Sequence, residues 1–327
     1  MYDIVTVGEG MLRLSPPPYQ RLRRTRTLDL DVCGSQGNVA CNAARLGLKS
    51  AFLTRVPDNA LGLLLQDHYA GCGVDITHIQ TIQNSRVGVN YVEFGSTPRP
   101  SAVVYDRAHS AASSIGPDDF DWERILKGAR VAYTDGIFPG LSASCRDAAF
   151  EFIATARRQG CLVAFDVNYR EHLWAPEEAR DVLSRIAADV DVLISSRWHA
   201  ETVFGYMGSD EEVMRRFHGA FGCKVVAITL REDHDVRHGA WNTALLYEDQ
   251  VLVGRGYEVD LVDRFGGGDA WSAGFVFGYL RQGDVEYAMN FGNALCALNH
   301  TFPGDVAHVS PAEVGALMNS GGFHVRR

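Results

Sequence analysis

Residues Asp263 to Trp271 read Asp-Arg-Phe-Gly-Gly-Gly-Asp-Ala-Trp and place three consecutive glycines directly before a helical pattern. That pattern consists of apolar residues at helical spacing, namely Ala273, Phe275, Val276, Tyr279 and Leu280. Glycines let a backbone fold closely around a ligand, and the N-terminus of a helix carries about half a positive charge. The stretch therefore predicts an anion-binding loop, with the anion hole at Gly266, Gly267 and Gly268.

Asp269 would lie beside the anion in this loop. A carboxylate is a poor ligand for a phosphate, but it is suited to accept a proton from an attacking hydroxyl group. This combination predicts phosphoryl transfer to an alcohol, with Asp269 as the catalytic base. The alternative is a tight glycine turn with Asp269 as an ordinary helix cap, since both residue types are preferred in those positions.

The rest of the chain alternates short β-rich runs with amphipathic helical stretches, which indicates an α/β protein with a mostly parallel sheet between two layers of helices. Strands are expected at residues 3–8, 51–56, 131–135, 162–166, 190–195, 224–229 and 243–248. The clearest helix begins at Pro176, a favoured first-turn proline, and repeats apolar residues through Ala187.

Two segments interrupt this alternation. Residues 10–33 contain three prolines and alternating apolar positions, and residues 86–108 have the pattern of a hairpin. We expect them to form a small antiparallel β lid over a site at the carboxyl ends of the parallel strands. With no linker or repeat in the sequence, residues 1–327 are expected to form a single domain.

Charge and composition exclude several classes of protein. The 327 residues include 31 Lys and Arg against 40 Asp and Glu, a net charge of −9, and 46% are hydrophobic. This composition is typical of a globular protein and disfavours a general nucleic-acid or anionic membrane surface. No apolar run approaches the ~18–20 residues of a membrane span, and the first residues lack a basic targeting region, so we expect a cytoplasmic protein without nucleic-acid or membrane partners.

The seven cysteines are scattered at long spacings without a Cys-x-x-Cys pair. This pattern favours reduced thiols that act as small core residues over a zinc or disulfide framework.

A first glycine cluster, Gly8-Glu9-Gly10, could suggest dinucleotide binding. The position that needs a third glycine is Arg13, and the prolines at 16–18 prevent the helix that should receive the pyrophosphate. An NAD-linked oxidoreductase is therefore disfavoured.

Two stretches resemble the signatures of the PfkB/ribokinase family of sugar kinases. Residues 263–270 resemble the pattern D-x-x-G-A-G-D-x, and residues 34–47, which run from Gly34 through Asn38 to Gly47, resemble G-G-x-x-x-N-x-A-x-x-x-A-R-L-G. The resemblance implies a ribokinase-like three-layer αβα sandwich, in which the glycine loop forms the anion hole for the transferred phosphate and Asp269 is the catalytic base.

Within that family, three segments are similar to those of 2-keto-3-deoxygluconate kinases: residues 8–16, 166–174 and 301–305. The resemblance implies a sugar-acid substrate and matches its binding positions to Gly34, Asn38, Tyr91, Tyr105, Arg107 and Arg170. Arg107 and Arg170 suit a carboxylate, because a guanidinium offers a planar fork of donors. The alternatives are Tyr91 as part of the lid core and Arg107 as a solvated surface charge.

On the nucleotide side, the resemblance implies ATP and Mg²⁺ as cofactors and matches Ser196, Thr229, Arg231 and Asn293 to nucleotide-binding positions. Here the sequence departs from the family, because the pattern N-x-x-E falls on Ser196 to His199. Histidine is a poor partner for Mg²⁺, so no residue of this sequence is assigned to a metal. As an alternative to metal handling at this position, a charged His199 could face the phosphates and supply positive charge directly.

Two other functions remain open from the sequence. One is a kinase of a neutral sugar such as ribose or fructose, which would not need Arg107 and Arg170. The other is a sugar-acid-binding protein that has lost phosphoryl transfer, which the changes at Ser196, His199 and Arg231 would motivate. Exposed lid strands favour pairing with a second copy, so a homo-oligomer is expected.

Overall fold

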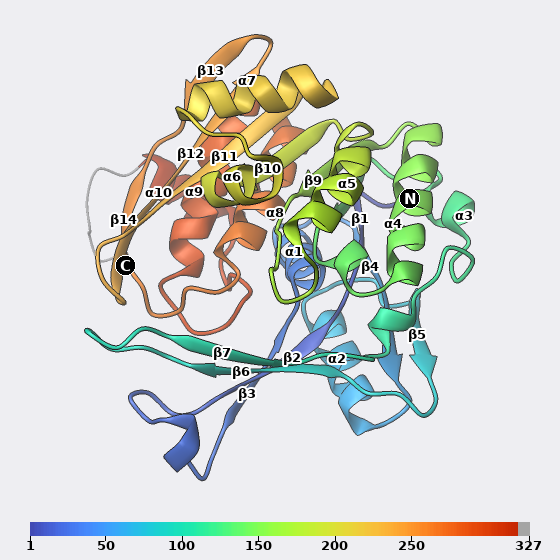
Figure 1. Ribbon diagram of the computed structural model, residues 1–327, viewed down its shortest axis with the longest axis vertical. Coiled ribbons are helices and arrows are strands. Elements are labelled where there is room, and N and C mark those ends of the chain that lie inside the picture. The colour runs from blue at the N-terminus through green and yellow to red at the C-terminus, as the bar shows by residue number, and fades with distance from the viewer. Residues whose placement is uncertain (320–327) are drawn as a thin grey trace.

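A ten-stranded sheet forms the middle layer of the protein in the computed structural model, which describes residues 1–319 (Figure 1). The strands along its main path are, in spatial order, β13 (Gln250–Val253), β12 (His238–Tyr247), β11 (Val225–Asp233), β10 (Val192–Ser196), β9 (Leu162–Asp166), β8 (Val131–Asp135), β1 (Ile4–Val7), β4 (Ser50–Pro57) and β5 (Ile79–Ile82). The tenth strand, β14 (Tyr257–Asp260), pairs with β12.

The sheet is parallel from β5 to β11 and antiparallel beyond β11. All seven predicted strands are present, with bounds within a few residues of the prediction except β12, which begins at His238. The parallel strands are buried on both faces, which explains why they read as continuous apolar runs in the sequence.

Helices cover both faces of this sheet, which confirms the three-layer αβα sandwich (Figure 1). One face is covered by α1 (Ser35–Arg45), α2 (Ala60–Gly71), α8 (Gly267–Gln282), α9 (Val285–Asn299) and α10 (Pro311–Asn319). The other face is covered by α3 (Trp122–Leu126), α4 (Ala143–Arg158), α5 (Pro176–Ala187), α6 (Arg197–Phe204) and α7 (Asp210–Phe221). Helix α5 begins at Pro176 as predicted, and within residues 1–319 no helix combines the length and apolarity that a bilayer span requires.

A second, four-stranded sheet projects from one end of the sandwich and is called the lid here (Figure 1). Its strands, in spatial order, are β3 (Asp29–Cys33), β2 (Met11–Ser15), β6 (Gly88–Glu93) and β7 (Ala102–Asp106). The two outer pairs are antiparallel, but β2 and β6 run parallel, so the lid is not antiparallel throughout as the sequence suggested. The difference arises because each segment folds into its own pair of strands and the two pairs join side by side.

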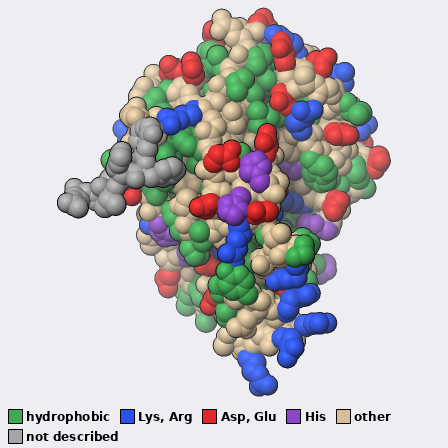
Figure 2. All heavy atoms as spheres, turned by 90° about the vertical axis from the view of Figure 1, so that its left-hand side faces the viewer, with side chains coloured by type: hydrophobic (Ala, Val, Ile, Leu, Met, Phe, Trp, Pro, Cys, Tyr) green, Lys and Arg blue, Asp and Glu red, His purple; other side chains and the backbone are tan. Residues whose placement is uncertain are grey.

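The register of the lid separates its side chains into two faces. One row across the four strands consists of Asp31, Arg13, Asn90 and Tyr105, and the neighbouring row consists of Leu30, Leu14, Tyr91 and Val104. Side chains alternate between the faces of a strand, so the polar row and the apolar row lie on opposite faces of the lid. The segment between β2 and β3 carries Arg21, Arg23, Arg24 and Arg26, and Figure 2 shows basic side chains gathered at this end of the molecule.

Helix α8 offers a matched pair of glycines for a stability test. Gly266 precedes the helix with φ of 72° and Gly283 follows it with φ of 70°. A Cβ added at Gly266 would lie 1.9 Å from the backbone oxygen of Asp305, whereas one at Gly283 would meet nothing within 4 Å. Both alanine variants should lose about 1–2 kcal/mol from left-handed backbone strain.

We expect Gly266→Ala to lose roughly 1–3 kcal/mol more than Gly283→Ala in urea unfolding, because the backbone of residue 305 must move. Equal losses in the two variants would contradict this close approach of the two loops.

Candidate active site

Two cavities meet at the carboxyl ends of the parallel strands. The larger, of about 850 Å³, lies over the ends of β9, β10 and β11 and reaches the glycine loop. The smaller, of about 90 Å³, lies between the lid and the start of α1. The linings of the two cavities share five residues, which are Tyr105, Arg170, Phe265, Gly266 and Asp269. A ligand in one cavity can therefore contact a ligand in the other at this junction.

The glycine loop presents free backbone donors to the larger cavity. The first helical hydrogen bond of α8 runs from the amide of Ala270 to the oxygen of Gly266 at 2.8 Å. The amides of Gly267, Gly268 and Asp269 have no hydrogen-bond partner among the described residues. A Cβ at Gly268 would meet nothing within 4 Å, so this part of the loop faces open space. Unpaired amides at a helix N-terminus favour an anion, which agrees with the predicted anion hole.

Asp269 is oriented by side chains of α1, and it is not the cap of α8, which is Gly266. Ser35 donates from Oγ to one carboxylate oxygen at 2.7 Å, and Asn38 donates from Nδ2 to the other at 2.8 Å. Burial raises the pKa of Asp269 to about 6, although both hydrogen bonds favour the charged form. A carboxyl group with that pKa is largely ionised at neutral pH and can accept a proton.

Two further carboxyl groups lie beside Asp269 at the strand ends. Asp135 ends β8 and is fully buried, and Asp166 ends β9 and lines the larger cavity. Burial, together with the nearby Asp135, raises the pKa of Asp166 to about 8. A group with that pKa is mostly protonated at neutral pH, and a further cation close to it would favour the ionised form. The sequence analysis used Asp166 for the resemblance alone and missed it as a site residue.

The residues predicted for the sugar acid gather around the smaller cavity, with one exception. Gly34, Asn38, Tyr105, Arg107 and Arg170 all line it. Gly34 has φ of 130°, and a Cβ there would lie 2.2 Å from the backbone oxygen of Glu9, so the close approach requires glycine.

The two arginines differ in how free they are. Arg107 is 9% exposed and forms a buried ion pair with Glu9 through Nε, at 2.9 Å, and Nη2. Its Nη1 group has no partner among residues 1–319. The guanidinium of Arg170 forms no hydrogen bond or ion pair within the described chain, and it lines both cavities. Arg170 is therefore the freer of the two cations, and Arg107 is not a solvated surface charge.

Tyr91 is the exception, because it lies in the outer apolar row of the lid and does not line the smaller cavity. The neighbouring residue Asn90 lines the cavity in its place. Successive side chains of a strand point to opposite faces, so a one-residue error moved the predicted contact to the wrong face. The alternation of apolar and polar residues in this strand could have identified Asn90.

On the nucleotide side, Ser196, Thr229 and Arg231 line the larger cavity. Ser196 also caps α6 through the amide of His199 at 3.1 Å, and Arg231 pairs through Nε with Asp233 at 3.0 Å. Burial and the nearby Arg170 lower the pKa of His199 to about 3, which favours a neutral imidazole over the charged alternative at physiological pH.

Asn293 does not face the larger cavity. It is fully buried in α9, where Oδ1 accepts from Thr243 at 2.8 Å and from Trp271 at 3.0 Å. Its Nδ2 donates to Asn242 and to the backbone oxygen of Arg255, both at 3.1 Å. With all its hydrogen-bonding capacity used inside the core, Asn293 joins β12 to α8 and α9 and has no free group for a nucleotide.

Comparison with known families identifies the chain. The model of the pfkB family of carbohydrate kinases matches residues 1–311. The chain belongs to the PfkB family of carbohydrate kinases. This kinase is 35% identical over 326 residues to 2-dehydro-3-deoxygalactonokinase of Haloferax volcanii, a match that covers 99% of each chain.

Among solved structures, 2-dehydro-3-deoxygluconokinase of Thermotoga maritima matches the kinase with a TM-score of 0.94 at 35% identity, covering 98% of this chain and 100% of that chain. A ribokinase-like protein of Escherichia coli, solved with ATP and Mg²⁺, has a TM-score of 0.85 at 19% identity and covers 97% and 99% of the two chains. The second match is a likeness of fold. The family and the ribokinase-like fold predicted from the sequence are thus confirmed.

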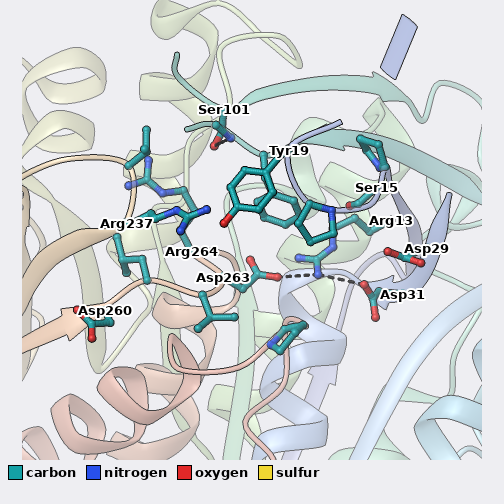
Figure 3. Close-up of a pocket in the computed structure, with 18 of the residues that line it drawn as sticks. Arg13, Ser15, Tyr19, Asp29, Asp31, Ser101, Arg237, Asp260, Asp263 and Arg264 are labelled. Carbon is teal, nitrogen blue, oxygen red and sulfur yellow. Dashed lines mark hydrogen bonds and ion pairs between the residues drawn. The ribbon is translucent and has the colours of Figure 1, made fainter. Parts of the chain in front are cut away.

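In this kinase a buried arginine joins the lid to the glycine loop. Arg13 of β2 is 1% exposed and pairs with Asp263 at 2.8 Å, Asp305 at 2.5 Å and Asp31 at 3.1 Å. Figure 3 shows its guanidinium between Asp31 and Asp263, beside a separate cavity of about 630 Å³. Asp305 accepts a further bond from Asn38 at 3.3 Å, so the network reaches the residue that orients Asp269.

Replacing Arg13 should therefore destabilise the kinase strongly. In Arg13→Met the carboxylates of Asp263 and Asp305 lose their buried partner, which should cost about 3–5 kcal/mol in urea unfolding. The matched control Arg130→Met removes a half-exposed pair with Asp3 and should change stability by less than about 1 kcal/mol. Similar losses in both variants would contradict a structural role for the Arg13 network.

Proposed function

We propose that this kinase transfers the γ-phosphoryl group of ATP to a hydroxyl group of a 2-keto-3-deoxy sugar acid. The observation that carries the proposal is the position of Asp269, which lines both cavities and is held there by Ser35 and Asn38. The substrate class is supported by two relatives at 35% identity, whose names specify such acids. It is also supported by an unpaired arginine at the junction.

The sugar acid would occupy the smaller cavity. Arg170 and the free Nη1 of Arg107 would bind its carboxylate, since charge-assisted bonds from a guanidinium are strong and directional. Gly34, Asn38 and Tyr105, together with Asn90, line the same cavity, and the polar side chains among them can bind hydroxyl groups. The cavity is small, so we expect the lid to move as the sugar acid enters and to close over it afterwards.

The nucleotide would occupy the larger cavity, with its transferred phosphate on the amides of Gly266, Gly267 and Gly268. Ser196, Thr229 and Arg231 supply polar and positive groups along the same cavity. Mg²⁺ would offset phosphate charge, and Asp166 is suited to hold it directly or through water, because its carboxyl oxygens line the cavity and Mg²⁺ prefers oxygen ligands. In this role Asp166, at the end of β9, would act in place of the glutamate that the family pattern has where this sequence has His199.

Asp269 would accept the proton of the attacking hydroxyl group. Phosphoryl transfer of this kind depends chiefly on positioning and on charge stabilisation. Ser35 and Asn38 fix the carboxylate against α1, and the glycine amides of α8 lie within one helical turn of it. The acceptor, the base and the phosphate site are therefore held by two helices that pack against each other.

A coupled assay of ADP release tests the proposal over 2-keto-3-deoxygluconate, its galactonate epimer, gluconate, ribose and fructose, with ATP and Mg²⁺. We expect turnover of 2-keto acids only. Turnover of ribose or fructose at comparable kcat/KM would favour a neutral-sugar kinase. A protein that binds a keto acid without releasing ADP would favour the impaired binding protein.

The role of Arg170 predicts a selective effect on the acid substrate. Arg170→Met should raise the KM for the keto acid about ten- to a hundredfold, because a charge-assisted hydrogen bond contributes roughly 1.5–3 kcal/mol. Arg185→Met is the control, since this exposed arginine of α5 lies over Phe150, away from both cavities. An unchanged KM in Arg170→Met would contradict the binding of the substrate's carboxylate to Arg170.

The pKa of Asp269 predicts the acid limb of the rate profile. Protonation removes the base, so kcat/KM should be level above a pH of about 6 and fall about tenfold for each pH unit below it. Asp269→Asn should lower kcat by roughly 10²–10⁴-fold and remove this limb, while ATP affinity measured by calorimetry stays within a few fold. A variant that kept either the rate or the acid limb would contradict the assignment.

We also propose that the kinase pairs with a second copy through the apolar outer row of the lid, formed by Leu30, Leu14, Tyr91 and Val104. Leu30 is 45% and Val104 56% exposed, and apolar side chains in a row across four strands favour a sheet-to-sheet contact. Val104→Asp should shift the molecular mass measured by light scattering towards the monomer. Val253→Asp, at a 64% exposed position of β13, should not, and equal behaviour of the two variants would contradict the proposal.

A further inference from the structure

Three metal-ligating side chains converge between α1 and α2, outside both cavities of the kinase site. Cys41 comes from the middle of α1, His68 from the last turns of α2, and Cys72 from the residue that ends α2. Their ligand atoms all lie within 4.8 Å of one another. The sequence analysis treated these cysteines as separate core residues, because Cys41 and Cys72 are 31 positions apart.

Helical geometry explains the arrangement. His68 and Cys72 are four residues apart, and the amide of Cys72 donates to the backbone oxygen of His68 at 3.0 Å, so the two side chains lie on one face of α2. Cys72 Sγ lies 3.9 Å from His68 Nε2. A tetrahedral Zn²⁺ with bonds of about 2.3 Å to sulfur and 2.0 Å to nitrogen would hold these atoms roughly 3.6 Å apart. Only a small movement of side chains is needed.

The surroundings are suited to a closed metal site. Cys41 is fully buried and Cys72 is 8% exposed, in a cluster with apolar residues such as Leu65 and Val306.

The loop before α10 carries a candidate for the fourth ligand, which lies outside the group of three. His308 is exposed, and its Nδ1 lies 2.5 Å from Nη2 of Arg45 in the same helix as Cys41. The position can otherwise be filled by water, as in zinc sites with three protein ligands.

We propose that Cys41, His68 and Cys72 form a Zn²⁺ site that joins α1 to α2, with His308 or water as the fourth ligand. Two sulfur ligands and an imidazole select a borderline-soft ion over the hard Mg²⁺ of the kinase reaction. Binding requires both cysteines as thiolates, so their thiol protons pass to solvent and the site becomes a neutral Zn²⁺ bis-thiolate. The site fixes the second half of α1, whose first half carries Ser35 and Asn38.

Cobalt substitution tests the proposal on the untagged full chain, reduced and freed of metal with a chelator. Co²⁺ bound to thiolate gives a ligand-to-metal charge-transfer absorption, and its displacement by Zn²⁺ reports zinc affinity. We expect one Co²⁺ per chain with this absorption, its loss on adding Zn²⁺, and a higher melting temperature with Zn²⁺.

Variants separate the site from other thiols. Cys72→Ser should abolish the absorption, and His68→Asn, at a partly exposed position, should weaken binding at least tenfold while leaving the fold intact. Cys223→Ser is the control, because Cys223 is a buried thiol that donates to the backbone oxygen of Ala187 and a hydroxyl group can do the same.

Three results would overturn the proposal. They are the absence of a charge-transfer band in the wild-type chain, a band of equal strength in Cys72→Ser, and an equal loss in Cys223→Ser. Should Cys72→Ser fail to fold, the stoichiometry of the wild-type chain and the affinity of His68→Asn decide it. An affinity reduced in His308→Ala would assign the fourth ligand to that residue, and an unchanged one would assign it to water.

Discussion

The buried guanidinium of Arg13 holds together the three parts of the chain that form the active site. Through Asp263 it reaches the start of the glycine loop, and through Asp305 it reaches the loop against which Gly266 packs. Arg13 itself belongs to the lid, so one cation fixes the lid relative to the glycine loop. Arg13, Asp263 and Asp305 are buried, so the cation and these two carboxylates each need the others, whereas Asp31 completes the network from a partly exposed position.

This constraint explains why the two cavities meet where they do. Asp305 is shared between Arg13 and Asn38, and Asn38 in turn orients Asp269. Asp269 is therefore linked to the lid through one chain of polar contacts. The face of the lid that carries Arg13 and Asn90 borders the smaller cavity, so the Arg13 network supports both this cavity and the glycine loop.

Much of the fold could be predicted from the sequence, because strands buried on both faces and a proline-started helix leave clear local patterns. The parallel pairing of β2 and β6 could not, since it depends on how two separate strand pairs meet in space. In the site, the position of Gly266 and Asp269 at the two cavities could be predicted, because it follows from the glycine loop and the helix behind it. The positions of Tyr91 and Asn293 could not, because a one-residue register and the hydrogen-bond saturation of a buried amide are set by tertiary contacts.

In the proposed reaction a sugar acid and a nucleotide meet at Asp269. The most direct measurement is a crystal structure with 2-keto-3-deoxygluconate and a non-hydrolysable ATP analogue. The account predicts the acceptor hydroxyl within hydrogen-bond distance of Asp269, the carboxylate on Arg170 and the terminal phosphate on the amides of the glycine loop. A sugar acid bound elsewhere, such as in the cavity beside Arg13, or a hydroxyl group directed away from Asp269, would contradict it.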